Sequence, residues 1–275
     1  MTGRLGVSGE VIAAARSQGR AALVGYLPVG YPDVPTSIRA MRALCEGGEG
    51  PGVDLVEIGM PYSDPLMDGL AIQYATTRAL QRGVHTRDVF RAVEAVAAAD
   101  RTPLVMIYWN LVEHYGVDRF AADLASAGGA GLITPDLTPD EAGSWVAASD
   151  DHGLDRVFLV APSSTDERLR STVAACRGWV YATSVMGVTG ARQSTSTAAP
   201  VLVQRIRAAD PAIMVGVGLG VSNGEQAAEI AGFADAVIVG SALVSRLIQA
   251  ERAGTDDLTA LRDTVDDLAR GVRTT

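Results

Sequence analysis

The sequence contains no lysine, and this absence excludes several kinds of catalysis. All 23 basic residues are arginines, and there are only 3 histidines in 275 residues. Schiff-base chemistry and covalent attachment of pyridoxal phosphate need a lysine amine, as does a Walker A phosphate loop. The few histidines disfavour a zinc or iron site, so we expect no metal. Chemistry in this chain must therefore use carboxylates, hydroxyls, backbone amides or arginines.

Basic charge, long apolar runs and cysteines are also scarce, which limits the partners and the compartment. With 23 basic and 32 acidic residues, the net charge of −9 disfavours binding to nucleic acid or to an anionic membrane surface. No apolar run approaches the ~20 residues of a membrane span, and residues 1–20 lack a signal-peptide core. Cys45 and Cys176 cannot form a disulfide framework. We therefore expect a cytoplasmic protein.

Short apolar or β-branched runs alternate with Ala- and Leu-rich stretches of helical spacing. About eight such strand–helix units are typical of a (β/α)8 barrel. A doubly wound open sheet would instead need a glycine fingerprint after its first strand, where this chain has residues 28–32, Pro-Val-Gly-Tyr-Pro. We predict one (β/α)8 TIM barrel domain over residues 1–275, with an extra N-terminal helix at 7–18 and a last helix at 255–270. The predicted strands are 21–28, 53–59, 103–108, 130–134, 156–160, 179–183, 213–217 and 236–239.

Glu57 is the first candidate catalytic residue, because of its place in the second predicted strand. Side chains alternate along a strand, so the apolar Val56 and Ile58 share the face that meets the helices. Glu57 then points into the barrel at the carboxyl end of the strand, where barrel enzymes place catalytic residues. A buried carboxylate there is costly unless it is used or paired. The competing interpretation is that Glu57 forms an ion pair with an arginine in the barrel mouth.

The loop after that strand contains two further acids, Asp64 and Asp68. Pro61 and Pro65 restrict the backbone of this loop, which places its acids. Asp68 is predicted to reach back over the barrel mouth as a second carboxylate. Both aspartates also fit a simpler interpretation as turn formers, since one precedes a proline and the other a glycine.

Glycine clusters follow the last three predicted strands, at residues 187–190, 218–222 and 240–241. Glycines let backbone N–H groups approach an anion, and a helix N-terminus adds positive potential. Loops after strands seven and eight are where barrels bind phosphate. The clusters therefore predict a phosphate site, with ordinary turn glycines as the alternative.

Residues 57–69, Glu-Ile-Gly-Met-Pro-Tyr-Ser-Asp-Pro-Leu-Met-Asp-Gly, with Gln73 just beyond, resemble the signature of the tryptophan synthase alpha chain family. The motifs at 108–110, 135–137, 187–190, 218–222 and 240–241 also match that family in order and spacing. The resemblance covers essentially the whole chain. It implies a (β/α)8 barrel that catalyses retro-aldol cleavage of indole-3-glycerol phosphate to indole and glyceraldehyde 3-phosphate, in the biosynthesis of tryptophan.

The resemblance also implies roles for particular residues. Glu57 would be the general acid and base, with a pKa raised by an apolar pocket. Asp68 would be the partner carboxylate near the indole nitrogen, ionised on a wetter loop. Asp64 and Thr189 would belong to loops that close over the substrate. The implied binding residues are Tyr26, Tyr108 and Tyr181 for indole, and Gly190, Gly220, Gly240 and Ser241 for phosphate.

A partner is implied as well. Members of the family act with a beta chain that holds pyridoxal phosphate, in an alpha2-beta2 heterotetramer. This lysine-free chain cannot anchor that cofactor itself, so we expect it on the partner. The expected docking face is the barrel mouth, at residues 62–69, 111–116 and 135–140.

The sequence departs from the family pattern at four places near the site, namely Tyr31, Tyr62, Met67 and Leu219. None of these removes a catalytic group, but all bear on the indole pocket and on loop closure. Two other functions compete with the lyase: another phosphate-binding barrel enzyme, such as a sugar-phosphate isomerase or indole-glycerol-phosphate synthase, and a noncatalytic allosteric partner. The synthase chemistry relies on lysine, and the intact Glu57 and Asp68 disfavour the noncatalytic alternative.

Overall fold

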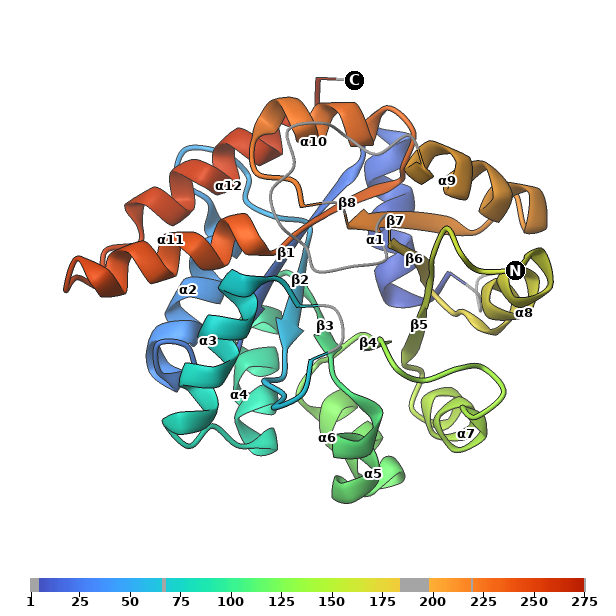
Figure 1. Ribbon diagram of the computed structural model, residues 1–275, viewed down its shortest axis with the longest axis horizontal. Helices are drawn as coiled ribbons and strands as arrows, with labels where there is room; N and C mark the ends of the chain where they lie inside the picture. Colours follow the sequence, from blue (N-terminus) through green and yellow to red (C-terminus); the bar gives the residue numbers. More distant parts are fainter. Residues whose placement is uncertain (1–4, 66–67, 184–197, 219, 275) are drawn as a thin grey trace.

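A computed structural model describes residues 5–65, 68–183, 198–218 and 220–274. In this part of the chain, eight parallel strands pair in sequence order and close into a barrel, with β8 next to β1 (Figure 1). The predicted (β/α)8 architecture is therefore confirmed. The strands are β1 (Ala22–Pro28), β2 (Leu55–Gly59), β3 (Thr102–Met106), β4 (Gly131–Thr134), β5 (Asp155–Val160), β6 (Trp179–Thr183), β7 (Met214–Gly218) and β8 (Ala236–Val239).

Helices surround the barrel on its outer side (Figure 1). Local signals explain where two of them begin: Asp33 and Thr165 accept hydrogen bonds from backbone N–H groups at the starts of their helices. The helices are α1 (Gly6–Ser17), α2 (Val34–Glu46), α3 (Leu70–Gln81), α4 (Thr86–Ala97), α5 (Trp109–Tyr115), α6 (Val117–Ser126), α7 (Gly143–Asp151), α8 (Asp166–Ala175), α9 (Ala198–Ala209), α10 (Gly224–Ala231), α11 (Ser241–Arg252) and α12 (Thr259–Gly271).

The alternation of side chains along β2 divides two hydrophobic cores. Leu55 belongs to the core inside the barrel, whereas Val56 and Ile58 belong to the larger core between the strands and the helices. This is the division predicted from the sequence, and it leaves Glu57 on the inner face.

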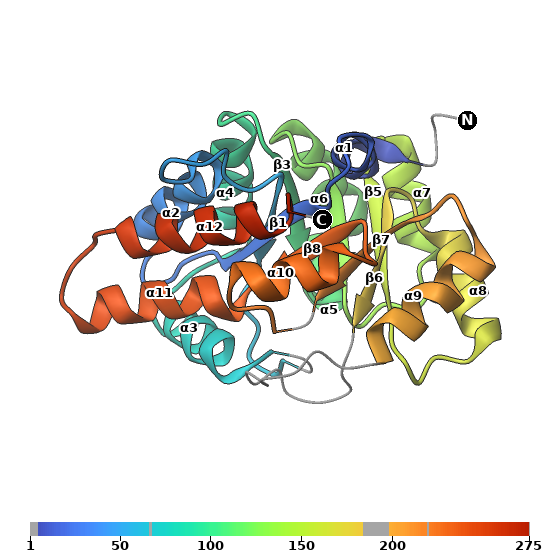
Figure 2. The ribbon, with the colours of Figure 1, turned by 90° about the horizontal axis from the view of Figure 1, so that it is seen from above.

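Helix α1 covers the amino-terminal end of the barrel. Its Ile12 and Ala15 join the inner core, and Figure 2 shows α1 along the opposite edge of the molecule from α3. The helix is held by the buried Asp155, whose Oδ2 accepts hydrogen bonds from the backbone N–H (2.7 Å) and the hydroxyl (2.5 Å) of Ser8. Polar contacts thus attach α1 to the start of β5.

We expect Ser8→Ala to lower the free energy of unfolding by about 1–3 kcal/mol, because a buried Asp155 carboxyl loses its hydroxyl donor. The matched control is Ser17→Ala on the same helix, where the hydroxyl is exposed and bonds to the Ala14 carbonyl. Urea denaturation of both variants measures the difference. Equal stability of the two variants would contradict this account of how α1 is attached.

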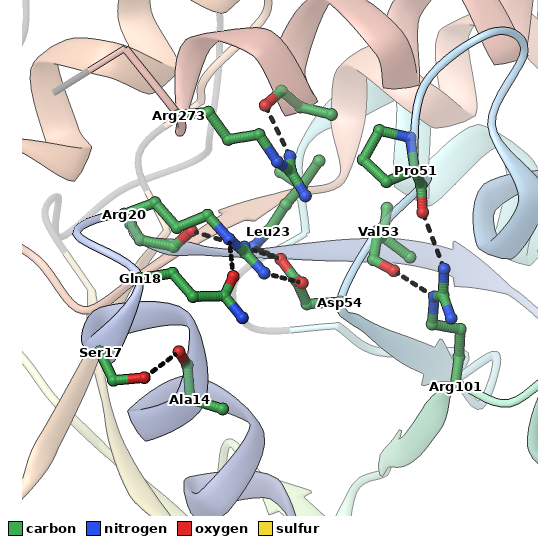
Figure 3. A network of polar contacts seen from close by, with 12 residues as sticks. Ala14, Ser17, Gln18, Arg20, Leu23, Pro51, Val53, Asp54, Arg101 and Arg273 are labelled. Atoms are coloured by element: carbon green, nitrogen blue, oxygen red, sulfur yellow. Dashed lines mark hydrogen bonds and ion pairs between the residues drawn. The ribbon is translucent and has the colours of Figure 1, made fainter.

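A second polar network joins the loops at the same end of the barrel (Figure 3). The Arg20 guanidinium donates two hydrogen bonds of 2.8 Å to the carboxylate of Asp54, which also accepts from the backbone N–H of Leu23. Nearby, Arg101 donates to the carbonyls of Val53 and Pro51. These bonds fix the chain just before β2, and therefore the register in which β2 carries Glu57.

The structure differs from the sequence predictions mainly at element ends. Strand β3 stops at Met106, so Tyr108, predicted at the end of that strand, instead lies immediately before α5 with extended backbone angles. The last helix begins at Thr259 rather than 255, because Asp257 accepts hydrogen bonds from the backbone and hydroxyl of Thr259. Tyr108, in the loop after β3, still lies at the carboxyl end of the barrel.

Candidate active site

Glu57 lies inside the barrel near the carboxyl end of β2. It is 1% exposed, and its register partners on the neighbouring strands are Tyr26 and Leu104. Paired residues of parallel strands face the same side of the sheet, so Tyr26 shares the barrel interior with Glu57. The side-chain direction predicted from sequence alternation is therefore confirmed.

Among the described residues, the buried Glu57 carboxyl lacks the ion pair and the full set of hydrogen bonds that usually stabilise a buried carboxylate. Its Oε2 has no hydrogen-bond partner among the described residues, and none of their ion pairs joins it to an arginine. The interpretation of Glu57 as half of a mouth ion pair thus finds no support. Burial, with a smaller contribution from the charge of Asp68, raises the pKa of Glu57 to about 8. The carboxyl is consequently protonated at neutral pH.

Asp68 lies two residues before α3, next to its N-cap Gly69, and close enough for its charge to act on Glu57. The Asp68 side chain is half-buried, and burial raises its pKa to about 6. The Asp68 carboxylate is therefore better hydrated than that of Glu57, as expected for this loop, although the barrel mouth removes part of the water around it. Asp68 is nevertheless mostly ionised at neutral pH, so one of the two carboxyls is protonated and the other is charged.

Three tyrosines predicted to line the site converge on these acids. Tyr26 and Tyr181 have pKa values raised well above 10 by burial and by the charges of Asp68 and Glu57. Tyr108 also acts on Tyr26, and its ring stacks on Tyr62 with centroids 4.3 Å apart. Residues from β1, β6 and the two loops after β2 and β3 thus meet at one end of the barrel.

The helix that follows β8 starts without a side-chain cap. Helix α11 starts at Ser241 after Gly240, with no side-chain cap, whereas α10 is capped by Asn223, which accepts from the Gln226 N–H. Uncapped N–H groups at a helix N-terminus bind anions. Gly220, in the loop between β7 and α10, has a φ of +65°, a conformation that favours glycine.

Among the other predicted residues, Asp64 contributes little to this geometry. Asp64 is exposed, and the Ser63 hydroxyl donates to its Oδ2 over 2.6 Å. Thr189 and Gly190 lie outside the described residues, as do Met67 and Leu219.

Gly59 of the 57–69 motif and Gly218 of the 218–222 cluster make room for the tyrosines, a role that the sequence analysis did not predict. A Cβ on Gly59 would lie 2.3 Å from the Tyr26 hydroxyl, and one on Gly218 would lie 2.5 Å from the Tyr181 hydroxyl. Both glycines end a strand, and each is two residues beyond the register partner of its tyrosine. This relation between each glycine and its tyrosine depends on how β1 pairs with β2 and β6 with β7, which the sequence alone does not show.

Comparison with known proteins decides the family. The family model described as tryptophan synthase alpha chain matches residues 12–273. The chain belongs to the tryptophan synthase alpha chain family. A curated tryptophan synthase alpha chain from Mycobacterium avium is 61% identical over 265 residues, covering 96% of this chain and 94% of the relative.

Solved structures agree with this assignment. A structure of Mycobacterium tuberculosis tryptophan synthase aligns with a TM-score of 0.91 at 57% identity, covering 98% of this chain and 99% of that one. Tryptophan synthase subunit alpha from Legionella pneumophila aligns with a TM-score of 0.86 at 29% identity, covering 97% and 98%. Tryptophan synthase alpha chains are enzyme subunits that catalyse cleavage of indole-3-glycerol phosphate, so this chain is a carbon–carbon lyase of tryptophan biosynthesis.

Within the described ranges, no three His, Cys, Asp or Glu side chains gather as metal ligands would. Over the same ranges, every helix is too short or too polar to cross a membrane.

Proposed function

We propose that Glu57 and Asp68 together carry out the cleavage of indole-3-glycerol phosphate in this chain. The observation that carries the proposal is a buried Glu57, with its pKa raised to about 8, next to an Asp68 with a pKa of about 6. Two carboxyls whose pKa values differ in this way can serve as proton donor and charge stabiliser at one pH.

Each carboxyl has a separate task in the proposed reaction. Glu57 gives its proton to indole C3 and takes the proton of the C3′ hydroxyl. The C3–C3′ bond breaks, its electron pair returns to the indole ring, and C3′ becomes the aldehyde carbon. Asp68 stabilises the positive charge that forms on the indole nitrogen when C3 is protonated. This sequence of proton transfers needs neither a metal nor a lysine.

The substrate would lie between the tyrosines and the glycine loops. Tyr26, Tyr108 and Tyr181 supply aromatic surface for the indole ring. The glycerol phosphate would extend toward the start of α11, where the N–H groups after Gly240 have no side-chain cap. Gly190, Gly220 and Ser241 complete the proposed phosphate site, and Asp64 and Thr189 the closing loops.

A cleavage assay with the purified chain tests this proposal. Release of indole from indole-3-glycerol phosphate is the expected result. Turnover of a sugar phosphate instead would favour an isomerase. Binding of the substrate without indole release, with or without a beta chain, would support the noncatalytic alternative.

We expect Gly240→Val to raise the KM for indole-3-glycerol phosphate by about 10- to 100-fold, the cost of losing hydrogen bonds to a charged group. A Cβ at this position would lie only 3.2 Å from the Tyr26 ring, and the larger side chain would cover the helix N-terminus. Gly143→Val is the control, because Gly143 also begins a helix but has open space around its Cβ position. Steady-state kinetics of both variants decide; equal KM values would refute the phosphate site.

We also propose that the chain is cytoplasmic and acts with a beta chain that carries pyridoxal phosphate, in an alpha2-beta2 heterotetramer. The absence of lysine supports the location of the cofactor on the partner. Two solved structures similar to this chain are of tryptophan synthase from Mycobacterium tuberculosis. Gel filtration with a beta chain, and cleavage kinetics in its presence, test the partnership. The absence of a complex, together with an unchanged cleavage rate, would refute the partnership.

A further inference from the structure

We propose that Gln73 is a positioning residue for the cleavage reaction, which acts by holding the backbone of Asp68 in place. The side-chain Nε2 of Gln73 donates a 2.7 Å hydrogen bond to the backbone carbonyl of Asp68. This inference rests on the proposed role of Asp68, and it assigns Gln73 no contact with the substrate.

The position of Gln73 on α3 explains how it can do this. Its backbone N–H donates to the carbonyl of Gly69 over 2.9 Å, as an ordinary helical bond. Its side chain reaches one residue further back, beyond the helix start, to Asp68. Helix α3 therefore holds the backbone of Asp68, near the end of the loop after β2.

The start of α3 needs such a contact. The residue at the helix N-cap is Gly69, which makes no side-chain capping bond and allows the backbone wide conformational freedom. Asp68 precedes this glycine directly. Without the Gln73 amide, a flexible residue would separate the carboxylate from the helix that carries it.

A small shift of the Asp68 carboxylate is expected to slow the reaction, because its charge interacts with several groups of the site. Its charge acts on Glu57 of β2, on Tyr26 of β1 and on Tyr181 of β6. A misplacement of about 1 Å at a reacting centre can cost 10²-fold in rate. Substrate binding by the tyrosines and the glycine loops does not depend on Asp68 in the same way, so kcat should respond more than KM.

The test compares variants of two glutamines on the same helix. Q73M has a side chain of similar length without a donor, and Q73E keeps the shape but, when ionised, has only acceptors. Q81M is the control, since Gln81 is exposed at the far end of α3. We expect a fall in kcat of about 10- to 100-fold for Q73M and Q73E. Their KM and melting temperature, and all properties of Q81M, should match those of wild type.

A double variant separates this inference from the proposed function. In the background of Asp68→Asn, Q73M should cause no further loss, because its effect passes through Asp68. A further fall of the same size would show that Gln73 acts elsewhere and would overturn the inference. Wild-type kcat in Q73M and Q73E, with an inactive Asp68→Asn, would overturn it as well while leaving the proposed function intact. An active Asp68→Asn would instead remove the proposed function. If Q73M does not fold, Q73E, which keeps the native shape, makes the same comparison.

Discussion

Glu57→Gln is expected to fold and to bind a substrate analogue, yet to cleave indole-3-glycerol phosphate at least about 10²–10⁴-fold more slowly than wild type. The amide keeps the size of the buried side chain but can neither release nor accept the proton. The loss is expected at the upper end of that range, because Glu57 serves two proton transfers. Single-turnover measurement of indole release checks this result, and retention of more than roughly a tenth of the rate would exclude Glu57 as the general acid and base.

The stability of Glu57→Gln separates lost chemistry from lost structure. Folding raises the pKa of this carboxyl from 4.5 to about 8, so between these values the unfolded chain releases a proton that the folded state keeps, and the folded state loses stability as the pH rises. A neutral glutamine does not titrate. The variant should therefore gain stability relative to wild type as the pH rises from about 5 to about 8. Glu94→Gln, exposed on α4, is the control and should change neither activity nor this pH dependence.

Asp68→Asn is expected to lower kcat by about 10²–10³-fold, the usual loss when one electrostatic stabiliser of a transition state is removed. This effect should be smaller than that of Glu57→Gln, because the amide still occupies the site and only the negative charge is gone. Asp263→Asn, on the exposed face of α12, serves as the control. A wild-type kcat in Asp68→Asn would contradict the proposed role of the carboxylate.

The pH profile gives a second readout of the same pair. In wild type, activity should fall below about pH 6, as Asp68 takes up a proton, and above about pH 8, as Glu57 loses its own. In Asp68→Asn the acidic limb should disappear. The alkaline limb should move to lower pH, because the charge that helps to raise the pKa of Glu57 is absent. An alkaline limb that stays in place would show that the two carboxyls do not interact.

Much of the fold could be predicted from the sequence because its signals are local. Apolar runs and turn residues placed all eight strands within about two residues, a normal uncertainty for element ends. Alternation within β2 predicted that Glu57 faces inward. Tyr108 was wrongly predicted to end β3, since an apolar run does not show where a strand gives way to the loop before a helix.

The candidate site was only partly predictable. Glu57 and Asp68 were identified from a motif in one short segment, but the burial that raises the pKa of Asp68 to about 6 was not anticipated. Burial of a carboxylate depends on residues that the chain brings together from other strands, such as Tyr26 and Tyr181. The role of Gly59 and Gly218, which accommodate those tyrosines, was missed because it depends on register across strands.

The sequence by itself determined the family, the order of strands and helices, and the face of β2 on which Glu57 lies. These properties follow from local patterns and from a long motif that needs no tertiary contact. Only the tertiary structure decided that Glu57 is protonated at neutral pH, that Asp68 is half-buried, and that Gln73 holds the Asp68 backbone. The physical reason is that desolvation and charge interactions depend on distances between segments, which are set only when the barrel closes.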